Sequence, residues 1–379
     1  DTAPADPWLR RTWVLPEAPK RAVAHVASVG YHELWINGRK VGDAVLVPSV
    51  TDHSRRARYL AYEIGDYLRP GTNVLGLWLG TGWSIFPKYA RPDRPQAPLV
   101  RAEFRAENDG GEVGRLGTDS SWVWRASPSR LLGVWDFMHF GGEEYDANRE
   151  VPGWAEAGSE GEGWTPVEVF EPALELSADL VEPNRVIEGS VLEPREVKEV
   201  EPGVWRVDFG RNVAGFVELG IEGARPGDRV EMQFSEQAKE RMTHRMRSVY
   251  VAGPSGRGVF RNRFNYAVGR WMTVTGLRSR PTHARAWLVR SGYDGVATFE
   301  SSNPWLNRAH ETARWTFENL SLGGYLVDCP HRERMGYGGD AHATTTMGLL
   351  QYRMGAFYTK WGEDWRDVQG RGAAWGSGS

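Results

Sequence analysis

The sequence predicts a multidomain protein in which two β-sandwich domains are followed by the first helices of a helical domain. The chain has 379 residues, which is enough for roughly two to four domains of ordinary size. Short runs that alternate apolar and polar side chains with period two fill most of it, and the period becomes helical near Ser301. The expected domains are residues 1–170, 171–299 and 300–379.

The composition excludes several classes of protein. Lysine and arginine number 46 against 49 aspartate and glutamate residues, so the formal net charge of -3 provides no positive field for nucleic acid. No apolar run approaches the roughly 20 residues that a membrane-spanning helix needs. A single cysteine, Cys329, excludes an intrachain disulfide and a zinc site built from cysteines. Neither nucleic acid nor a membrane is therefore expected as a partner.

Tryptophan is unusually frequent, with 18 residues against 13 tyrosines and 13 phenylalanines. Indole rings stack on the C–H faces of sugars while their N–H group remains free to donate a hydrogen bond. The surplus favours a carbohydrate ligand, although the cores of β-sandwiches also collect tryptophan.

The first domain is predicted from short alternating runs separated by turns, among them Ala22–Ser28 and Tyr31–Ile36. Asn37 and Gly38 follow the second run and are typical of a type I′ turn, because both residue types tolerate positive φ angles. We therefore expect Tyr31–Ile36 to pair antiparallel with Lys40–Val47. A further buried strand is predicted over Asn73–Leu79.

The second domain is predicted after a stretch rich in glycine, glutamate and proline, residues 152–174, which marks the boundary. Val204–Phe209, Gly215–Ile221 and Arg229–Phe234 alternate with period two and are predicted to be strands. The basic segment Lys239–Arg247 is interpreted as a solvated loop rather than a ligand site.

Two helices are predicted in the last part of the chain. Asn303 and its neighbours offer an N-cap before Pro304, which predicts a helix over residues 304–320. Asp340 is expected to cap a second, long helix whose apolar face carries Met347, Leu350, Met354, Phe357, Tyr358 and Trp361. Glu363, Asp364 and Asp367, with Lys360 and Arg366, are interpreted as a solvated face of that helix. Two helices cannot bury both of their faces unaided, so we expect them to open a larger helical domain.

The segment between these helices is the densest polar segment of the sequence. Asp328, Glu333 and Asp340 are interleaved there with Arg332 and Arg334. Carboxylates accept hydrogen bonds from neighbouring sugar hydroxyls, and guanidinium groups stabilise some carboxylates as anions. A partly desolvated carboxyl group instead has a raised pKa and a proton to donate. The combination suits cleavage of a glycoside, which needs one carboxylic acid and one carboxylate.

Other interpretations of this segment stay open. It could be a surface loop of solvated ion pairs. Asp328 and Asp340 are hard ligands for calcium, but their spacing does not match an EF-hand loop. His331 and His342 lack a third zinc ligand at a suitable spacing, and Cys329 has no identifiable partner base. We therefore predict no cofactor and no metal; a structural calcium ion is possible but not indicated.

Residues 328–341 resemble the signature of the bacterial α-L-rhamnosidases of glycoside hydrolase family 78. The usual form of that signature is Asp-Cys-Pro-Gln-Arg-Glu/Asp followed by Arg-Leu-Gly-Trp-Thr-Gly-Asp-Ala. Glu33–Gly42 and Gly142–Ala147 resemble the amino-terminal domain of the family. Asp208–Phe216, and Phe264–Tyr266 with Gly269–Trp271, resemble the β domain that precedes its catalytic barrel.

This resemblance implies an (α/α)6 barrel and an inverting, exo-acting hydrolase that releases terminal α-L-rhamnose from plant or microbial glycans and glycosides. Glu333 would be the general acid, and Asp328 and Asp340 would hold rhamnose hydroxyls. Arg332 would pair with a nearby carboxylate, and Tyr337 could stack on the sugar. The general base of the family is a glutamate much later in the barrel, beyond residue 379. The chain is therefore expected to be truncated within the barrel and to lack half of its catalytic pair.

Departures from the family signature leave two alternatives open. Tyr337 and Gly338 stand where the family has Trp-Thr, and His331 stands in place of glutamine. One alternative is a lyase that cleaves rhamnosyl-glucuronate by β-elimination, in which Arg332 or Arg334 would neutralise the uronate. The other is a non-catalytic carbohydrate-binding fragment, which two β domains and the tryptophan surplus also fit.

Overall fold

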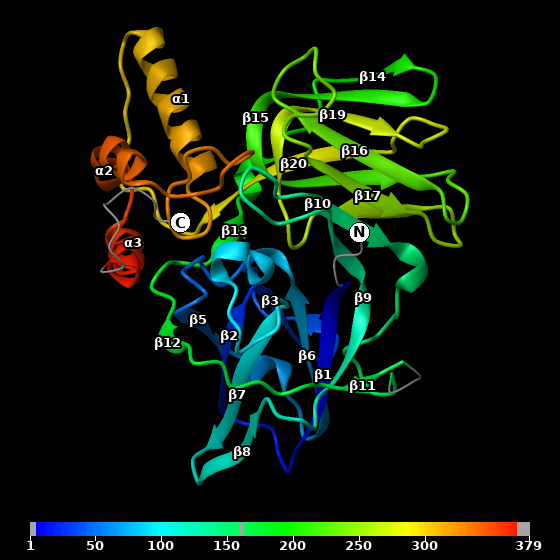
Figure 1. The fold of residues 1–379 in the computed structure, drawn as a ribbon, viewed down its shortest axis with the longest axis vertical. Coiled ribbons are helices and arrows are strands. Elements are labelled where there is room, and N and C mark those ends of the chain that lie inside the picture. The colour runs from blue at the N-terminus through cyan, green and yellow to red at the C-terminus, as the bar shows by residue number, and fades with distance from the viewer. Residues whose placement is uncertain (1–4, 160–162, 370–379) are drawn as a thin grey trace. The chain divides into compact units, whose positions relative to one another are not determined.

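The computed structural model describes residues 5–159 and 163–369 (Figure 1). The chain forms two units, and each of them is built from two separate segments. The first unit comprises Asp1–Leu131 and Arg149–Asp179, and the second comprises Leu132–Asn148 and Leu180–Ser379. The segment Leu132–Asn148 therefore leaves the first unit and belongs to the second. The division into three domains that the sequence suggests stays a prediction.

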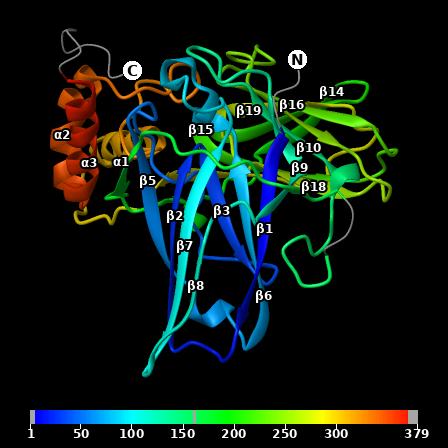
Figure 2. The same cartoon turned by 60° about the horizontal axis from the view of Figure 1, so that its bottom comes forward.

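The first unit contains two β-sheets (Figure 2). One consists of β1 (Ala5–Leu15), β3 (Tyr31–Ile36), β4 (Arg39–Lys40), β6 (Gly71–Gly80), β9 (Val123–Leu132) and β11 (Thr165–Pro166). The other has the order β12 (Glu175–Ala178), β5 (Arg56–Glu63), β2 (Arg21–Val29), β7 (Leu99–Asn108) and β8 (Gly111–Gly117). Short 3-10 helices η1 (Gly65–Tyr67), η2 (Gly82–Ile85) and η3 (Pro87–Tyr89) lie in the connections. Neighbouring strands are antiparallel, except that β12 runs parallel to β5.

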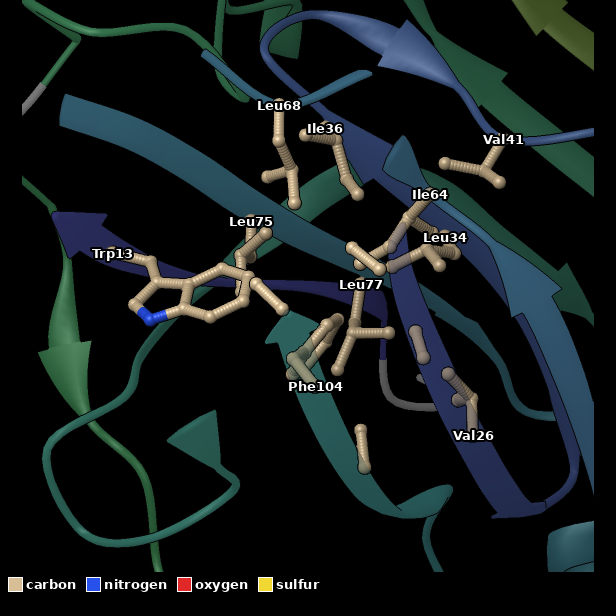
Figure 3. Close-up of a cluster of buried hydrophobic side chains, with 14 of the residues drawn as sticks. Trp13, Val26, Leu34, Ile36, Val41, Ile64, Leu68, Leu75, Leu77 and Phe104 are labelled. Atoms are coloured by element: carbon tan, nitrogen blue, oxygen red, sulfur yellow. The ribbon is translucent and has the colours of Figure 1, made fainter. Parts of the chain in front are cut away.

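Both sheets contribute to one hydrophobic core (Figure 3). Because successive side chains of a strand point to opposite faces, the period-two pattern puts one set of apolar residues on the inner face of each sheet. The buried residues include Trp13 and Leu15 of β1, Leu34 and Ile36 of β3, Leu75 and Leu77 of β6, Val26 of β2 and Phe104 of β7. The first unit is thus a β-sandwich, as predicted.

The turn predicted at Asn37 and Gly38 is confirmed. Both residues have positive φ angles, 49° and 78°, as a type I′ turn requires. Trp35 pairs with Lys40 across the turn, and pairing in β4 ends there. Beyond it the Val41 amide donates to the carbonyl of Leu34 at 2.8 Å, and an isolated bridge joins His32 to Val47. The hairpin is therefore shorter than the alternation suggests.

The second unit is built on one large sheet with the order β13 (Asn184–Val186), β20 (Ala284–Ser291), β15 (Val204–Ile221), β19 (Ala267–Thr275), β16 (Arg229–Ser235), β17 (Arg247–Val251) and β10 (Gly142–Asp146). β14 (Glu196–Glu201) and β18 (Gly258–Arg261) also pair with β15. The short helices η4 (Ala147–Arg149) and η5 (Glu188–Ser190) lie in its connections. The two strands predicted on either side of residue 212 are one strand, β15, whose register with β19 shifts between Asp208 and Val213. β10, from the segment Leu132–Asn148, runs parallel to β17.

The first predicted helix is confirmed. α1 spans Pro304–Leu320, and the side chain of Asn303 accepts a hydrogen bond from the Trp305 amide at 3.0 Å. The second prediction is wrong, because two helices replace the single long one. α2 spans Gly338–Gln351 and α3 spans Gly355–Val368. Asp340 lies in the first turn of α2 and is not its N-cap, which is Tyr337.

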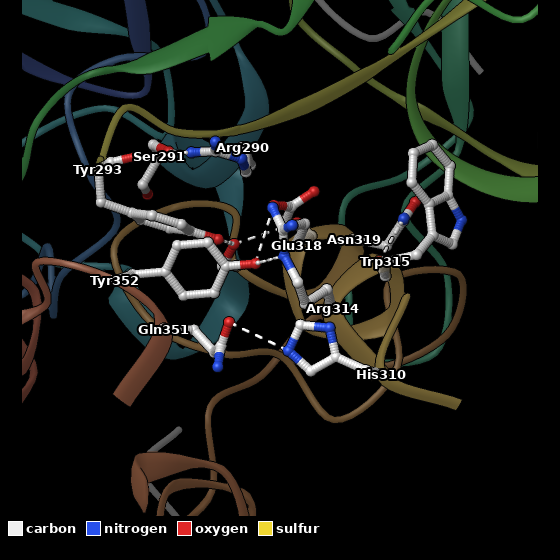
Figure 4. A network of polar contacts seen from close by, with 11 residues as sticks. Arg290, Ser291, Tyr293, His310, Arg314, Trp315, Glu318, Asn319, Gln351 and Tyr352 are labelled. Carbon is white, nitrogen blue, oxygen red and sulfur yellow. Dashed lines mark hydrogen bonds and ion pairs between the residues drawn. The ribbon is translucent and has the colours of Figure 1, made fainter. Parts of the chain in front are cut away.

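α2 ends at Tyr352, whose side chain takes part in a network of polar contacts (Figure 4). Its backbone is extended, with φ -141° and ψ 161°, and it forms a bridge with Gly295. The Tyr352 hydroxyl donates to Glu318 at 2.8 Å and accepts from Arg314 at 3.3 Å, so α1 holds the side chain. The backbone groups released by ending α2 find partners in the segment before α1: the Arg353 amide donates to the carbonyl of Asp294 at 3.0 Å.

The predicted solvated face of the second helix is also wrong. The Lys360 side chain is fully buried, and its ammonium group pairs with Asp364 at 2.6 Å and lies 5.1 Å from the ring centroid of Tyr325. Asp367 is buried as well. Burial of a lysine requires such a partner, which a sequence pattern does not reveal. Among the described helices, none has the length and apolar character that crossing a membrane would take.

Candidate active site

Residues 321–337 connect α1 to α2 and carry the polar segment identified in the sequence. The apolar residues Leu326, Val327 and Met335 flank its centre and are buried. The Val327 amide donates to the carbonyl of Leu320, at the end of α1, over 2.9 Å. The hydrophobic effect thus fixes both sides of the segment, and of the charged residues between them Asp328, Arg332 and Glu333 stay partly accessible while Arg334 is buried.

The polar segment closes on itself. The Asp328 amide donates to the carbonyl of Met335 at 2.8 Å, and the Arg334 amide donates to the carbonyl of Cys329 at 3.2 Å. Arg334 has a φ angle of 55°, which is uncommon for a residue with a side chain. We name residues 328–335 the carboxylate loop. Its closure brings Asp328 and Glu333 together although they are five positions apart.

Three of the loop's side chains meet at one point. One carboxylate oxygen each of Asp328 and Glu333 and the sulfur of Cys329 all lie within 4.8 Å of one another. The Cys329 thiol donates to Asp328 Oδ2 at 3.1 Å. On the other side, Arg332 Nη2 donates to Glu333 Oε1 at 2.8 Å. The guanidinium group therefore pairs with a nearby carboxylate, as the family resemblance implies.

The two carboxyl groups have opposite pKa shifts. Burial, reinforced by the hydrogen bond with Glu333, raises the pKa of Asp328 to about 6. The pKa of Glu333 is lowered, because Asp328 donates that hydrogen bond and Arg332 lies beside the carboxylate. Within the pair, the last proton therefore resides on Asp328 while Glu333 is ionised. The family resemblance implies a proton on Glu333, the general acid, but in this arrangement Asp328 holds that proton.

Tyr337 extends the group, whereas Asp340 stands apart. Burial and the negative charge of Glu333 raise the pKa of Tyr337 to about 12, so the phenol stays protonated and forms a hydrogen bond with Glu333. Asp340 is half-buried in the first turn of α2. Among the residues that the structure describes, its carboxylate makes no hydrogen bond or ion pair with the other four predicted site residues.

The structure adds Glu236 and His244, two residues that the sequence interpretation missed. His331 Nε2 lies 3.6 Å from a carboxylate oxygen of Glu236, and its ring centroid is 4.9 Å from that of His244. His244 belongs to the basic segment that was interpreted as a solvated loop. Burial and the charges of Arg332 and Arg334 lower the pKa of His331, so its imidazole is neutral at neutral pH. The loop between β16 and β17 therefore contacts the carboxylate loop. A local sequence pattern does not predict a contact between positions so far apart.

Among the described residues, one group could offer three ligands to a metal ion, namely Asp328, Cys329 and Glu333. Burial raises the pKa of the Cys329 thiol to about 11, which keeps the sulfur protonated and unsuited to metal binding at neutral pH. The calcium alternative paired Asp328 with Asp340, and these two residues make no shared contact in the described chain. The group's chemistry favours a shared proton over a cation.

The geometry suits a polar, uncharged ligand. Below about pH 6, where Asp328 keeps its proton, Glu333 can accept hydrogen bonds, while the Asp328 carboxyl group and the Tyr337 phenol can donate them. His331 Nδ1 and Arg332 Nε are buried and have no hydrogen-bond partner within the described residues. Buried polar atoms of this kind usually acquire partners, and the hydroxyl groups of a sugar would supply them.

Three family models match successive parts of the chain. The α-L-rhamnosidase N-terminal domain matches residues 17–188. The bacterial α-L-rhamnosidase concanavalin-like domain matches residues 198–290, and the bacterial α-L-rhamnosidase 6 hairpin glycosidase domain matches residues 294–376. The last match covers the carboxylate loop and all three helices.

Curated relatives agree with these matches. An α-L-rhamnosidase of Formosa agariphila is 28% identical over 368 residues, which cover 91% of this chain and 38% of the relative. An α-L-rhamnosidase of Streptomyces avermitilis is 28% identical over 383 residues, covering 95% of this chain and 36% of the relative. The chain thus spans less than two fifths of the length of these proteins.

Solved structures share the fold. The α-L-rhamnosidase of Dictyoglomus thermophilum superposes with a TM-score of 0.88 and 26% identity, over 97% of this chain and 41% of that one. The Streptomyces avermitilis α-L-rhamnosidase complexed with L-rhamnose gives a TM-score of 0.87 and 26% identity, over 97% of this chain and 36% of that one. The shared architecture therefore consists of β-rich units followed by helices, and these helices match part of a six-hairpin domain. Because all three models describe domains of bacterial α-L-rhamnosidases and together match most of the sequence, the chain belongs to the bacterial α-L-rhamnosidases.

Proposed function

We propose that the protein is an inverting, exo-acting α-L-rhamnosidase that releases terminal α-L-rhamnose from plant or microbial glycans and glycosides. The observation that carries this proposal is the pair of carboxyl groups on Asp328 and Glu333, which share a proton beside Arg332 and Tyr337. Family membership favours rhamnose as the sugar, and one relative is named as a complex with L-rhamnose.

In this proposal Glu333 is the general acid, although its pKa is lowered in the pair. Rhamnose hydroxyls that donate hydrogen bonds to Asp328 would stabilise its ionised form, and a sugar ring over Glu333 would remove water from that carboxylate. Both changes move the shared proton from Asp328 to Glu333, which then protonates the glycosidic oxygen. Substrate binding thus places the proton on Glu333, the general acid.

The remaining predicted residues bind the sugar. Asp328 and Asp340 accept hydrogen bonds from rhamnose hydroxyls, and Tyr337 offers an aromatic face and a phenol. Arg332 keeps the Glu333 carboxylate oriented through their 2.8 Å hydrogen bond.

Asp328 is too close to Glu333 to be the second catalytic carboxylate. Inverting glycosidases hold their two carboxyl groups roughly 6.5 to 9.5 Å apart to admit a water molecule, and retaining enzymes hold them about 5 to 5.5 Å apart. The oxygens of Asp328 and Glu333 lie within 4.8 Å of each other, which suits a shared proton. The general base of the proposed reaction is therefore a carboxylate outside this pair.

The lyase alternative receives less support from the geometry. It needs a guanidinium group free to neutralise a uronate, but Arg332 is engaged by Glu333, and the buried Arg334 donates to the carbonyl of Pro330 and to Asn265. A lyase would form an unsaturated uronate that absorbs in the near ultraviolet. Appearance of that absorbance on a rhamnosyl-glucuronate substrate would replace the hydrolase proposal.

The decisive experiment is Glu333→Gln in a protein that extends this chain to the length of its relatives. Turnover of an unactivated rhamnoside should fall roughly 10²- to 10⁴-fold, while an aryl rhamnoside with a good leaving group, which needs little protonation, should lose much less. Rhamnose affinity should stay nearly unchanged. Glu363→Gln, on α3, is the matched control and should retain activity. Full activity of Glu333→Gln on the unactivated substrate would end the assignment.

Proton NMR of the first product tests the stereochemistry and the non-catalytic alternative together. Initial release of β-L-rhamnose from an α-L-rhamnoside is the inverting outcome, and initial α-L-rhamnose would indicate retention. Binding of rhamnose without release of any product by the extended protein would favour a carbohydrate-binding role.

A further inference from the structure

Arg334 is a charged residue in a fully buried position. Its side chain is 1% exposed, and three of its nitrogens donate hydrogen bonds: Nε to the carbonyl of Pro330 at 3.0 Å, Nη1 to Asn265 Oδ1 at 2.8 Å and Nη2 to the carbonyl of Tyr266 at 3.1 Å. Burial of a guanidinium group costs several kcal/mol unless such partners are in place. A site this elaborate indicates a specific role.

Aromatic rings surround the same guanidinium group. Its central carbon lies 3.7 Å from the ring centroid of Tyr266, 5.1 Å from that of Phe140 and 5.4 Å from that of Trp135. Cation–π attraction is strongest when the cation is desolvated, as it is here. Phe140 and Trp135 belong to the segment Leu132–Asn148, so this segment forms one side of the cage.

Arg334 thereby joins three parts of the second unit. Asn265 accepts from Arg334 and donates through Nδ2 to the carbonyl of Phe140 at 2.8 Å. The carboxylate loop, the residues just before β19 and the segment Leu132–Asn148 are thus connected through one side chain. The carboxylate loop is held against the sheet by these contacts.

The same residue controls the closure of the loop. Its amide donates to the carbonyl of Cys329 and its Nε to the carbonyl of Pro330, so both bonds end next to Asp328. On its other side it follows Glu333 directly. Its left-handed backbone conformation costs roughly 1 kcal/mol or more, and the hydrogen bonds of its amide and side chain offset this cost.

We propose that Arg334 is a positioning residue, which holds the Asp328 and Glu333 carboxyl groups close enough to share a proton. It does not touch the sugar. The proposal rests on the proposed function only for its effect on turnover, and the geometric claim can be tested without any substrate.

The test uses Arg334→Lys, which keeps the charge but cannot make the three hydrogen bonds in their fork-like arrangement. Carbon-13 NMR of labelled aspartate follows the titration of Asp328. Among the signals that respond to changes at Cys329, Glu333 and Tyr337, the one that disappears in Asp328→Asn is assigned to Asp328. The midpoint near pH 6 should move down, toward the ordinary value for aspartate, because a displaced loop exposes Asp328 to water and separates the two carboxyl groups. Arg58→Lys, at a fully buried arginine of the first unit, should leave the midpoint in place.

Cys329 provides a second readout, because it is the only cysteine of the chain and donates to Asp328. Its alkylation by iodoacetamide at pH 8 should become at least roughly tenfold faster in Arg334→Lys, since the thiol is no longer buried beside a carboxyl group. A folded Arg334→Lys variant with an unchanged midpoint and an unchanged alkylation rate would overturn the proposal.

If Arg334→Lys does not fold, Phe140→Leu decides, because it removes one ring of the cage and leaves the hydrogen bonds. It should shift both readouts in the same direction by a smaller amount, and no shift would overturn the proposal. In the extended protein, Arg334→Lys should lower kcat at nearly constant KM. If Arg334→Lys shifts the titration midpoint of Asp328 but the extended protein does not cleave rhamnosides, the positioning role of Arg334 is supported and the proposed function is wrong.

Discussion

At the scale of single residues, the carboxyl pair couples the stability of the fold to pH. The pKa of Asp328 is about 6 in the folded chain against 3.8 for the unperturbed group. Between about pH 4 and pH 6 the unfolded chain therefore loses this proton while the folded chain keeps it. The contribution of Asp328 to stability is then fully present below pH 4 and is lost as the pH rises through 6.

Asp328→Asn should accordingly stabilise the chain at alkaline pH. We expect the free energy of unfolding to rise by about 1 to 2 kcal/mol at pH 8, less than the whole shift implies because solvent screens a half-buried group, and to change little at pH 4. Urea denaturation at both pH values measures this difference. Asp340→Asn is the control and should change stability by less than about 1 kcal/mol at either pH. A loss of stability at pH 8 in Asp328→Asn would contradict the raised pKa.

The site shows how far residue patterns reach. Asp328, Arg332 and Glu333 stood out as part of one dense polar segment, which closes on itself, whereas Tyr337 was named only through the family resemblance. The contact between His331 and His244 depends on the path of the sheet, so spacing could not predict it. The structural role of Arg334 was missed for the same reason, since its partners come from two distant segments.

At the scale of elements, the capping of α1 was readable from four consecutive residues because every group involved is local. Asn303→Ala removes the acceptor of the Trp305 amide and should lower the free energy of unfolding by about 1 kcal/mol. Thermal denaturation of this variant and of Ser302→Ala, an exposed neighbouring position, makes the comparison. Equal stability of the two variants would show that the cap contributes nothing.

The break between α2 and α3 was not readable, because it depends on partners in α1 and at Gly295. Apolar periodicity continues through Tyr352, so local propensity favours one helix, and the buried hydrogen bond to Glu318 decides otherwise. The same limit applies to Lys360, whose charge suggested an exposed face until its partner Asp364 was known. Patterns predicted where the helices lie, and tertiary contacts determined where they end.

Tyr352→Phe tests the contribution of this hydrogen bond. The variant keeps the ring but removes the shorter of two hydrogen bonds to the half-buried Glu318 carboxylate, the other coming from Arg314 at 3.4 Å, which should cost about 1.5 kcal/mol because the acceptor is charged. Hydrogen exchange should show the loss of protection concentrated where α1 meets residues 351–353. Unchanged protection there would mean that ring packing alone ends α2.

At the scale of the whole molecule, the second unit depends on a strand from the first half of the chain. A Cβ atom on Gly142 of β10 would lie 1.4 Å from the carbonyl oxygen of Arg247 in β17, so only glycine fits there. Gly142→Ala should therefore separate β10 from β17 and cost at least about 1 to 3 kcal/mol. Hydrogen exchange should increase in Gly142–Asp146 while β2 and β6 of the first unit stay protected. Gly189→Ala, where a Cβ meets nothing within 4 Å, is the control.

The position of β10 has a consequence for the order of events on the ribosome. β10 emerges about 100 residues before its partner β17, which at 5 to 20 residues per second is a delay of roughly 5 to 20 seconds. The strands of the first unit can pair during that interval, but the edge of β10 that pairs with β17 stays without its partner until β17 is made. The speed at which the ribosome translates residues 146 to 247 sets how long β10 waits for β17. This speed therefore affects the yield of folded protein.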